Sequence, residues 1–262
     1  MRLGEVATSQ GYRALQFDAL GSTNDEAMAR ARAGAPGALW ITAREQTAGR
    51  GRQGRVWVSP RGNLHASLLL VDACSPRYAA QLGFVAGVAL VEALRAAAPG
   101  APVGLKWPND VLSAGAKLAG VLVEGATLPG GRFACVVGFG VDCAASPDGL
   151  PYPATSLRAL GWAREPDDLL AALSDAVCCN LELWRAGAGF PAIRNAWLAR
   201  AAGLGRPIEA RTHKDVVRGV FETIDDEGRL VIAAPGGRVV IEAADVFPAH
   251  DARAMHPAED KR

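Results

Sequence analysis

The sequence has almost no net charge. Its 262 residues include 28 Lys and Arg against 27 Asp and Glu, which gives a formal net charge of +1. Proteins that bind nucleic acid or anionic membrane over a broad face carry an excess of basic residues. We therefore expect no nucleic acid and no membrane as a partner. Positive charge is instead local, concentrated in residues 50–61.

Long apolar runs and a signal peptide are also lacking. The most apolar helix candidate, residues 78–98, contains Gln81, Glu92 and Arg95, which argues against a membrane span. Residues 1–11 have no apolar stretch behind a basic start, so a secretory signal is not predicted. We expect a soluble, cytoplasmic protein.

Cysteine and histidine spacings typical of metal or redox sites are missing. The five cysteines form no C-x-x-C pair, and the four histidines show no ligand spacing, so no structural zinc is predicted. An odd number of cysteines fits a reducing cytoplasm. Cys178 and Cys179 fall in an apolar helical run, where we expect both to be buried.

The pattern of elements predicts an α+β fold. Predicted strands cover residues 12–19, 38–45, 64–71, 103–107, 117–124 and 133–142, and predicted helices cover residues 22–33, 76–98, 166–184 and 191–201. Hairpin-linked strands mixed with helices indicate a mixed, largely antiparallel sheet with packed helices. From residue 206 onward, four short strands separated by turns predict a small β-barrel. Residues 250–262 form a polar tail.

The strongest motif is the segment 49–57 (GRGRQGRVW), here named the Arg/Gly loop. Glycines let a backbone approach an anion closely, and guanidinium groups match phosphate oxygens two at a time. The letters also fit G-x-G-x-x-G, but β-favouring residues follow where a dinucleotide site needs a helix. The loop is thus interpreted as a phosphate-handling segment; a solvated basic loop is the alternative.

Four further segments combine polar and small residues: Ser22-Thr23-Asn24, residues 106–110 (KWPND), residues 117–125 (KLAGVLVEG) and residues 137–142 (VGFGVD). The first could hydrogen-bond a small neutral polar head group. Each segment alone also has an ordinary explanation: helix capping, a turn, a solvated lysine or a β-bulge.

In this order and at these separations, the segments resemble those of the biotin protein ligases, in the form that lacks an N-terminal DNA-binding domain. The resemblance covers roughly residues 17–142 and, more loosely, residues 205–247. It implies a catalytic domain over residues 1–203, similar to class II aminoacyl-tRNA synthetases, and a C-terminal SH3-like β-barrel over residues 204–249. The implied activity joins biotin to ATP as biotinyl-5′-AMP and then transfers biotin to a lysine of a biotin carboxyl carrier protein.

The resemblance also implies roles for individual residues. Biotin contacts fall on Ser22, Thr23, Asn24, Gln46, Arg50, Gly51, Arg52 and Lys117. Nucleotide or adenylate contacts fall on Arg52, Arg55, Trp57, Lys106, Asn109 and Asp142. Lys117, Arg52 and Asp110 are the expected catalytic residues. ATP and biotin are the expected substrates and Mg²⁺ the expected ion, with its ligands unassigned.

The sequence departs from the family pattern in two places. About 20 residues precede Ser22, too few for a helix-turn-helix, so no repressor activity is expected. Asp142 stands where relatives commonly have asparagine; we hypothesise that it positions Mg²⁺ or faces away from the polyphosphate. The alternative functions are a lipoate or octanoate ligase and a non-enzymatic biotin or nucleotide sensor. A homodimer is an open alternative to a monomer.

Overall fold

The computed structural model describes residues 2–162 and 165–249, so the predicted polar tail at 250–262 lies outside the described residues. The chain divides into two compact units. One holds Met1–Ala202 together with Asp226–Gly228, and the other holds the remainder from Gly203 onward. Each unit has its own sheet.

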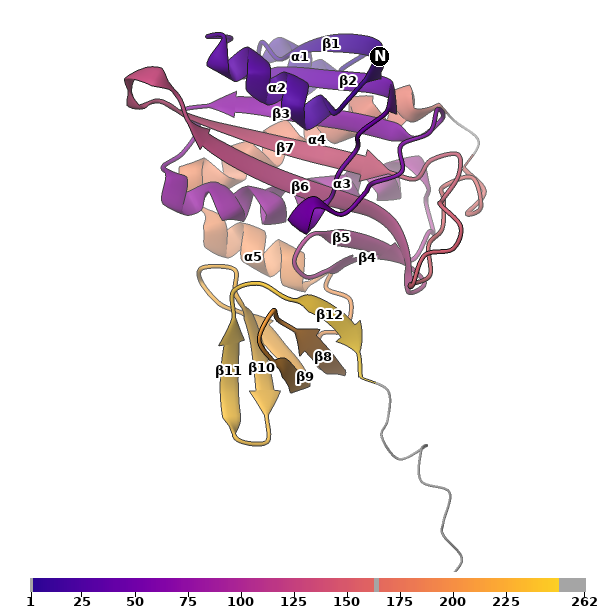
Figure 1. Ribbon diagram of the computed structural model, residues 1–262, viewed down its shortest axis with the longest axis vertical. Helices are drawn as coiled ribbons and strands as arrows, with labels where there is room; N and C mark the ends of the chain where they lie inside the picture. The colour runs from indigo at the N-terminus through magenta and orange to yellow at the C-terminus, as the bar shows by residue number, and fades with distance from the viewer. Residues whose placement is uncertain (1, 163–164, 250–262) are drawn as a thin grey trace, which may run out of the picture. The chain divides into compact units, whose positions relative to one another are not determined.

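The first unit is built on a seven-stranded mixed sheet with strand order β1-β2-β3-β7-β6-β5-β4 within the described residues (Figure 1). The strands are β1 (Arg13–Leu20), β2 (Leu39–Gln46), β3 (Leu64–Val71), β4 (Val103–Lys106), β5 (Asp110–Ser113), β6 (Ala116–Thr127) and β7 (Phe133–Val141). β1 and β2 pair in parallel, and every other neighbouring pair is antiparallel. The predicted fold class is confirmed.

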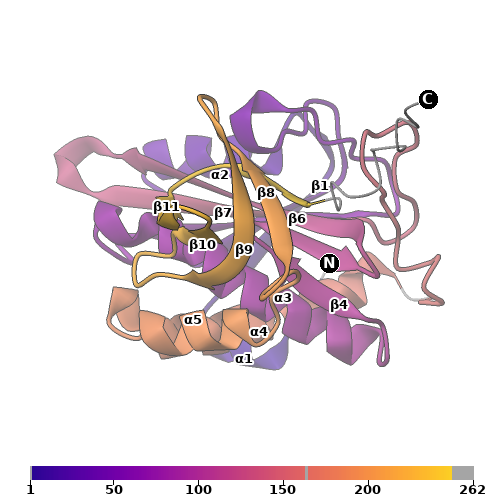
Figure 2. The ribbon, with the colours of Figure 1, turned by 90° about the horizontal axis from the view of Figure 1, so that it is seen from below.

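Helices cover both faces of this sheet. They are α1 (Glu5–Ser9), α2 (Thr23–Arg32), α3 (Leu82–Ala97), α4 (Pro166–Trp184) and α5 (Phe190–Leu198). Figures 1 and 2 show α2 on one face, with α3 and α4 on the other. By length and composition alone, the helical stretch Pro76–Ala97 could cross a membrane, but most of it is buried inside the protein. It is the core helix of the first unit.

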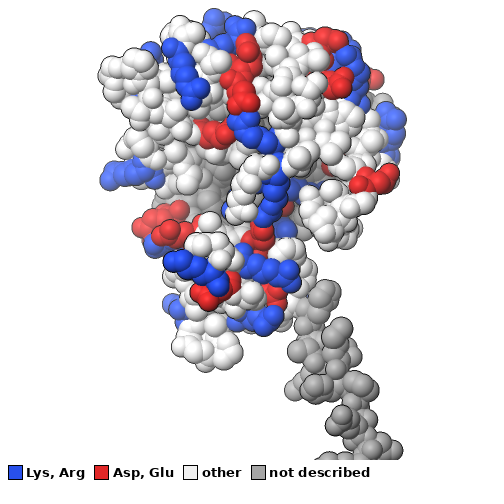
Figure 3. Space-filling model, viewed as in Figure 1, with Lys and Arg blue, Asp and Glu red and all other residues white. Residues whose placement is uncertain are grey.

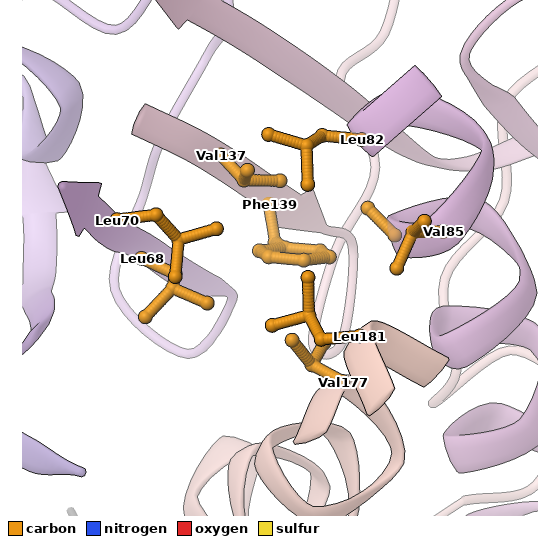
Figure 4. A pocket seen from close by; sticks show the side chains of 9 residues that line it. Leu68, Leu70, Leu82, Val85, Val137, Phe139, Val177 and Leu181 are labelled. Atoms are coloured by element: carbon orange, nitrogen blue, oxygen red, sulfur yellow. The ribbon is translucent and has the colours of Figure 1, made fainter. Parts of the chain in front are cut away.

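Successive side chains along the strands point to opposite faces of the sheet and so contribute to two apolar cores. In β3, Leu69 packs with Ala27 and Met28 of α2. Leu68 and Leu70 point the opposite way, because successive strand residues alternate between faces. They line a small apolar cavity between the sheet and helices α3 and α4 (Figure 4). The sheet is therefore buried on both faces at this level.

Several details differ from the predictions. α1 and β5 were not expected, because each is short: the amide of Ala7 in α1 donates to the distant Asp175 Oδ1 (2.9 Å), and the four residues of β5 form a strand by pairing with both β4 and β6. The helix predicted from residue 76 begins with a 3₁₀ segment, Pro76–Gln81. Cys178 is buried but Cys179 is exposed; neighbours on a helix point about 100° apart, so both cannot face the core.

The second unit is a five-stranded antiparallel sheet over the described part of the chain, with order β11-β10-β9-β8-β12. Its strands are β8 (Pro207–Arg211), β9 (Val216–Ile224), β10 (Leu230–Ala234), β11 (Gly237–Ile241) and β12 (Asp245–Pro248). The prediction of four strands was short by one. Ile208, Phe221 and Ile232 form part of its buried core.

Candidate active site

A row of residues across the sheet forms the base of the site. Antiparallel register places Lys106 opposite Asp110, Asp110 opposite Gly120, and Gly120 opposite Gly140. Residues directly opposite one another share a face of the sheet. Charged residues on β4 and β5 are thereby set beside two glycines on β6 and β7. This is the face that carries α2.

The glycines let other side chains lie directly on the backbone. A Cβ atom added to Gly140 would lie 2.5 Å from Nε1 and Cε2 of Trp57, and one added to Gly138 would clash with Oδ1 of Asn24. A Cβ added to Gly120 would lie 3.5 Å from Cζ3 of the same indole, which is ordinary van der Waals contact. The glycines of residues 137–142 therefore accommodate the side chains of two predicted site residues.

The first turn of α2 carries a polar network. Ser22 caps the helix, since its Oγ accepts from the amide of Asp25 at 3.4 Å. The amide and hydroxyl of Thr23 both donate to Oε1 of Gln46, at 2.8 and 3.0 Å. Gln46 in turn donates to Ser59 Oγ at 2.9 Å. The helix-capping explanation is thus confirmed for Ser22, while binding of a head group by this segment stays a prediction.

Two further residues complete this network, and the sequence analysis missed both. Ser67 Oγ lies 2.7 Å from Thr23 Oγ1 and 2.6 Å from Asn24 Oδ1, so its single proton serves one acceptor at a time. Asn24 Nδ2 donates to Glu124 Oε2 at 2.6 Å. A serine within the apolar strand 64–71 was the available signal for Ser67.

The Arg/Gly loop folds back on itself above this face. The amide of Gly51 donates to the carbonyl of Arg55 at 2.7 Å, and the amide of Trp57 donates to the carbonyl of Gly49 at 2.9 Å. At the tip, Gln53 and Gly54 both have positive φ, at 56° and 70°. The loop is therefore a tight hairpin-like turn that delivers Trp57 to the sheet.

The three arginines of the loop have different surroundings. Arg50 makes a two-pronged contact with Asp25, at 2.6 Å for each nitrogen, and also contacts both oxygens of Glu124 at 3.1 Å. Arg52 Nη1 lies 3.4 Å from Oδ1 of Asn109. Arg55 donates to Gln53 at 2.9 Å, within the loop itself. The structure thus brings Arg52 toward the KWPND turn and fixes Arg50 to α2 and β6.

Lys117 lies at the centre of the cationic part of the site. Its Nζ is 2.7 Å from Asp110 Oδ1, while the Nζ of Lys106 is 4.0 Å from the other oxygen of that carboxylate. The same ammonium lies 5.3 Å from the ring centre of Trp57 and 5.6 Å from that of Tyr152. Tyr152 lies in the connection between β7 and α4. An ammonium between two rings and a carboxylate is placed to receive an anion.

Asp142 is buried beside this cluster. Asn63 Nδ2 donates to its Oδ1 at 3.1 Å. Burial raises the pKa of Asp142 to about 7, an effect that the charge of Lys117 partly offsets. The Asp142 carboxylate, which the family resemblance places near the nucleotide, thus contacts the side-chain amide of Asn63. Near neutral pH it is a mixture of protonated and ionised forms.

The charges on the molecule fit a small anionic ligand better than an extended polyanion. On the face shown in Figure 3, acidic and basic side chains occur in small interspersed groups. The cations of the site converge on one end of the sheet face, and the polar network of α2 lies next to them. The arrangement suits a ligand with a neutral polar head and an anionic end.

Comparison with known proteins gives the same family for both units. The profile of the Biotin/lipoate A/B protein ligase family matches residues 22–142, and that of the Biotin protein ligase C terminal domain matches residues 203–247. The Biotin--[acetyl-CoA-carboxylase] ligase of Paracoccus denitrificans is 46% identical over 236 residues, which cover 86% of this chain and 96% of the relative. The Mycobacterium tuberculosis protein of the same name is 35% identical, with 92% and 91% covered.

A solved structure agrees with the fold. The biotin protein ligase from Aquifex aeolicus in complex with biotin and ATP superposes with a TM-score of 0.77 at 24% identity, covering 90% of this chain and 99% of that one. At 24% identity this similarity shows only that the fold is shared. The two ligases above are more similar in sequence, at 46% and 35% identity over nearly their whole length. The chain belongs to the biotin protein ligase family.

Proposed function

We propose that this chain activates biotin with ATP to form biotinyl-5′-AMP and then transfers the biotinyl group to a lysine of a biotin carboxyl carrier domain. One observation carries the proposal. The polar network of Thr23, Asn24 and Gln46 and the ammonium of Lys117 lie on one face of the sheet. That face offers hydrogen bonds for a head group and positive charge for a carboxylate.

The α2 end of the site would bind the head of biotin. Its cyclic urea presents one carbonyl oxygen and two N–H groups, which need both donors and acceptors. Ser22, Thr23, Asn24 and Gln46 supply both kinds, and Ser22, Thr23 and Asn24 are nearly buried. Buried polar groups discriminate strongly against a ligand that leaves them unpaired. This supports biotin over lipoate or octanoate, whose ends lack a urea.

The cationic end would support adenylation. A carboxylate oxygen of biotin forms a bond to the α-phosphorus of ATP, the bond from that phosphorus to the bridging oxygen breaks, and pyrophosphate leaves. Two anions meet in this step, so neutralisation of charge dominates its barrier. Lys117, Arg52 and Lys106 would provide positive charge, and Asp110 holds Lys117 in place at 2.7 Å.

The Arg/Gly loop would enclose the intermediate. Trp57 brings an indole N–H that is buried without a hydrogen-bond partner among the described residues, and Asn109 and Arg55 lie at or near the loop. In the second step the amine of the carrier lysine attacks the acyl carbon and AMP leaves with the bond electrons. Asp110 would orient that amine and accept its proton. Exclusion of water protects the adenylate until then.

The proposal includes Mg²⁺, bound together with ATP. Within residues 2–162 and 165–249 no group of three or more His, Cys, Asp or Glu is arranged to hold a metal. Mg²⁺ in nucleotide sites usually takes one or two carboxylates plus substrate phosphates and water. Asp110, beside Lys117, could supply one such carboxylate, and the ion would neutralise phosphate charge.

The carrier domain belongs to the proposal, as do the cytoplasmic location and the possible homodimer. The relatives' printed names include acetyl-CoA carboxylase as the protein acted on, which supports a carboxylase carrier domain as the acceptor. Free cysteines in the described part of the chain support a reducing compartment. Strand β1 forms one edge of the sheet, where a second copy could add its own strand.

Exchange of labelled pyrophosphate into ATP tests the first half-reaction. We expect exchange that requires both biotin and Mg²⁺ and that does not occur with lipoate. Exchange with lipoate alone would replace the proposal with a lipoate-type ligase. Absence of exchange with either acid would support a sensor.

A further inference from the structure

We propose that Asp25 and Glu124 are positioning residues that hold the Arg/Gly loop closed over the site through Arg50. The inference rests on the proposed function and gives Arg50 a different role from the biotin contact that the family resemblance implies. Its basis is the set of contacts around one guanidinium group, which joins the loop to two separate elements of the fold.

Arg50 anchors the loop through contacts with two carboxylates. Two of its nitrogens pair with the two oxygens of Asp25 at 2.6 Å each, and one of them also lies 3.1 Å from both oxygens of Glu124. Hydrogen bonds between charged groups are worth more than neutral ones, and the two-pronged form also fixes direction. Through this contact Arg50 lowers the pKa of Asp25, and Asp25 raises the pKa of Arg50.

The two carboxylates come from elements of regular structure outside the loop. Asp25 is in the first turn of α2, and Glu124 is in the middle of β6, where it pairs with Val136 of β7. Few backbone hydrogen bonds join the two sides of the loop, and Gly49, Gly51 and Gly54 give its backbone conformational freedom. An anchor of this kind sets how often such a loop opens.

Glu124 also connects the anchor to the head-group network. One of its oxygens accepts from Asn24 Nδ2 at 2.6 Å while the carboxylate contacts Arg50. A ligand that engages the Asn24 amide therefore changes what Glu124 can offer to Arg50. Biotin binding and loop closure share one carboxylate, which couples them without any contact between biotin and Arg50.

Tryptic cleavage in the loop of the ligand-free full-length chain tests the anchor directly. Asp25→Asn and Glu124→Gln keep the shape of the side chain and remove its charge, and we expect each to increase the initial rate of cleavage at Arg50, Arg52 or Arg55 at least threefold. Asp25→Glu should restore most of the protection. Asp72→Asn is the matched control, because Asp72 pairs with Arg132 at 2.7 Å in a different part of the sheet.

A second measurement, release of biotinyl-5′-AMP, tests whether the contacts of Arg50 affect the reaction. In Asp25→Asn, biotinyl-5′-AMP should leave the enzyme at least threefold faster, with a smaller effect on the maximal rate of pyrophosphate exchange. Cleavage and adenylate release equal to those of Asp72→Asn would overturn the proposal. If the wild type makes no adenylate, the proposed function fails, while the cleavage rates still decide whether Asp25 and Glu124 hold the loop.

Discussion

The indole of Trp57 lies on the backbone of Gly140, so closely that a Cβ at position 140 would be 2.5 Å from the indole nitrogen. This contact joins the end of the Arg/Gly loop to the middle of the sheet. The loop and the strands can form one site only because β7 has no side chain at this point. If Trp57 contacts the nucleotide as proposed, the absence of a side chain at Gly140 is a requirement for that contact.

Gly140→Ala should displace Trp57 and raise the KM for ATP about tenfold or more, since a misfit of this kind costs about 1 to 3 kcal/mol. The matched control is Gly83→Ala in α3, where the nearest atom to the added Cβ lies 3.8 Å away. We expect no change in KM from the control. Equal KM values for the two variants would show that Trp57 does not contribute to nucleotide binding.

Lys117→Ala should lower the rate of biotin-dependent pyrophosphate exchange by about 100-fold or more, as expected for loss of a cation that stabilises developing charge. The fold should be retained, because the side chain contacts Asp110, Trp57 and Tyr152 at the edge of the site. Thermal unfolding checks that point. An exchange rate close to wild type would remove Lys117 from the mechanism.

Arg52→Ala should release biotinyl-5′-AMP early and so biotinylate lysines of bystander proteins. Loss of a charged contact to the intermediate is worth about 1.5 to 3 kcal/mol, or about 10- to 100-fold in retention. Retention of labelled adenylate by gel filtration measures the effect. Equal retention by wild type and Arg52→Ala would contradict the assignment.

Asp142→Asn should change how stability depends on pH. Burial raises the pKa of Asp142 to about 7 in the folded protein, against 3.8 for an exposed aspartate, so between these pH values the folded state holds a proton that the unfolded state loses. The contribution of Asp142 to the free energy of unfolding is fully present below about pH 4. It decreases by about 1.4 kcal/mol per pH unit as the pH rises to about pH 7. The Asn variant lacks this decline, so its stability relative to wild type should rise from pH 5 to pH 7.

Chemical denaturation of both proteins at pH 5 and pH 7 measures this difference. The same difference in free energy of unfolding at the two pH values would mean that Asp142 is ionised throughout. The Mg²⁺ hypothesis has its own test: unchanged Mg²⁺ dependence of exchange in Asp142→Asn would exclude a role for Asp142 in holding the ion.

Local signals in the sequence predicted the parts of the fold that depend on local chemistry. Ser22 caps α2, Pro166 begins α4 and Gly34 follows the end of α2 with positive φ, all as the sequence indicates. β5 could not be predicted in this way, because four residues form a strand only when both neighbours supply hydrogen bonds. The same holds for α1, which depends on Asp175.

The candidate site likewise combines residues that local sequence predicts and residues that it does not. Its motif residues were predictable because each segment carries an unusual combination of glycine, charge and aromatic residues. The partners that arrange them were not, since Ser67, Glu124 and Asn63 contact residues between 43 and 100 positions away. No local pattern encodes such pairs. The roles of the individual site residues remain predictions.

Intact mass spectrometry of a carrier protein tests the central claim most directly. The chain is incubated with ATP, Mg²⁺ and an apo biotin carboxyl carrier domain, together with either biotin or lipoate. The account predicts a mass increase equal to one biotinyl group with biotin, and no increase with lipoate or when the acceptor lysine is replaced by arginine. A carrier that gains no mass with biotin would contradict it.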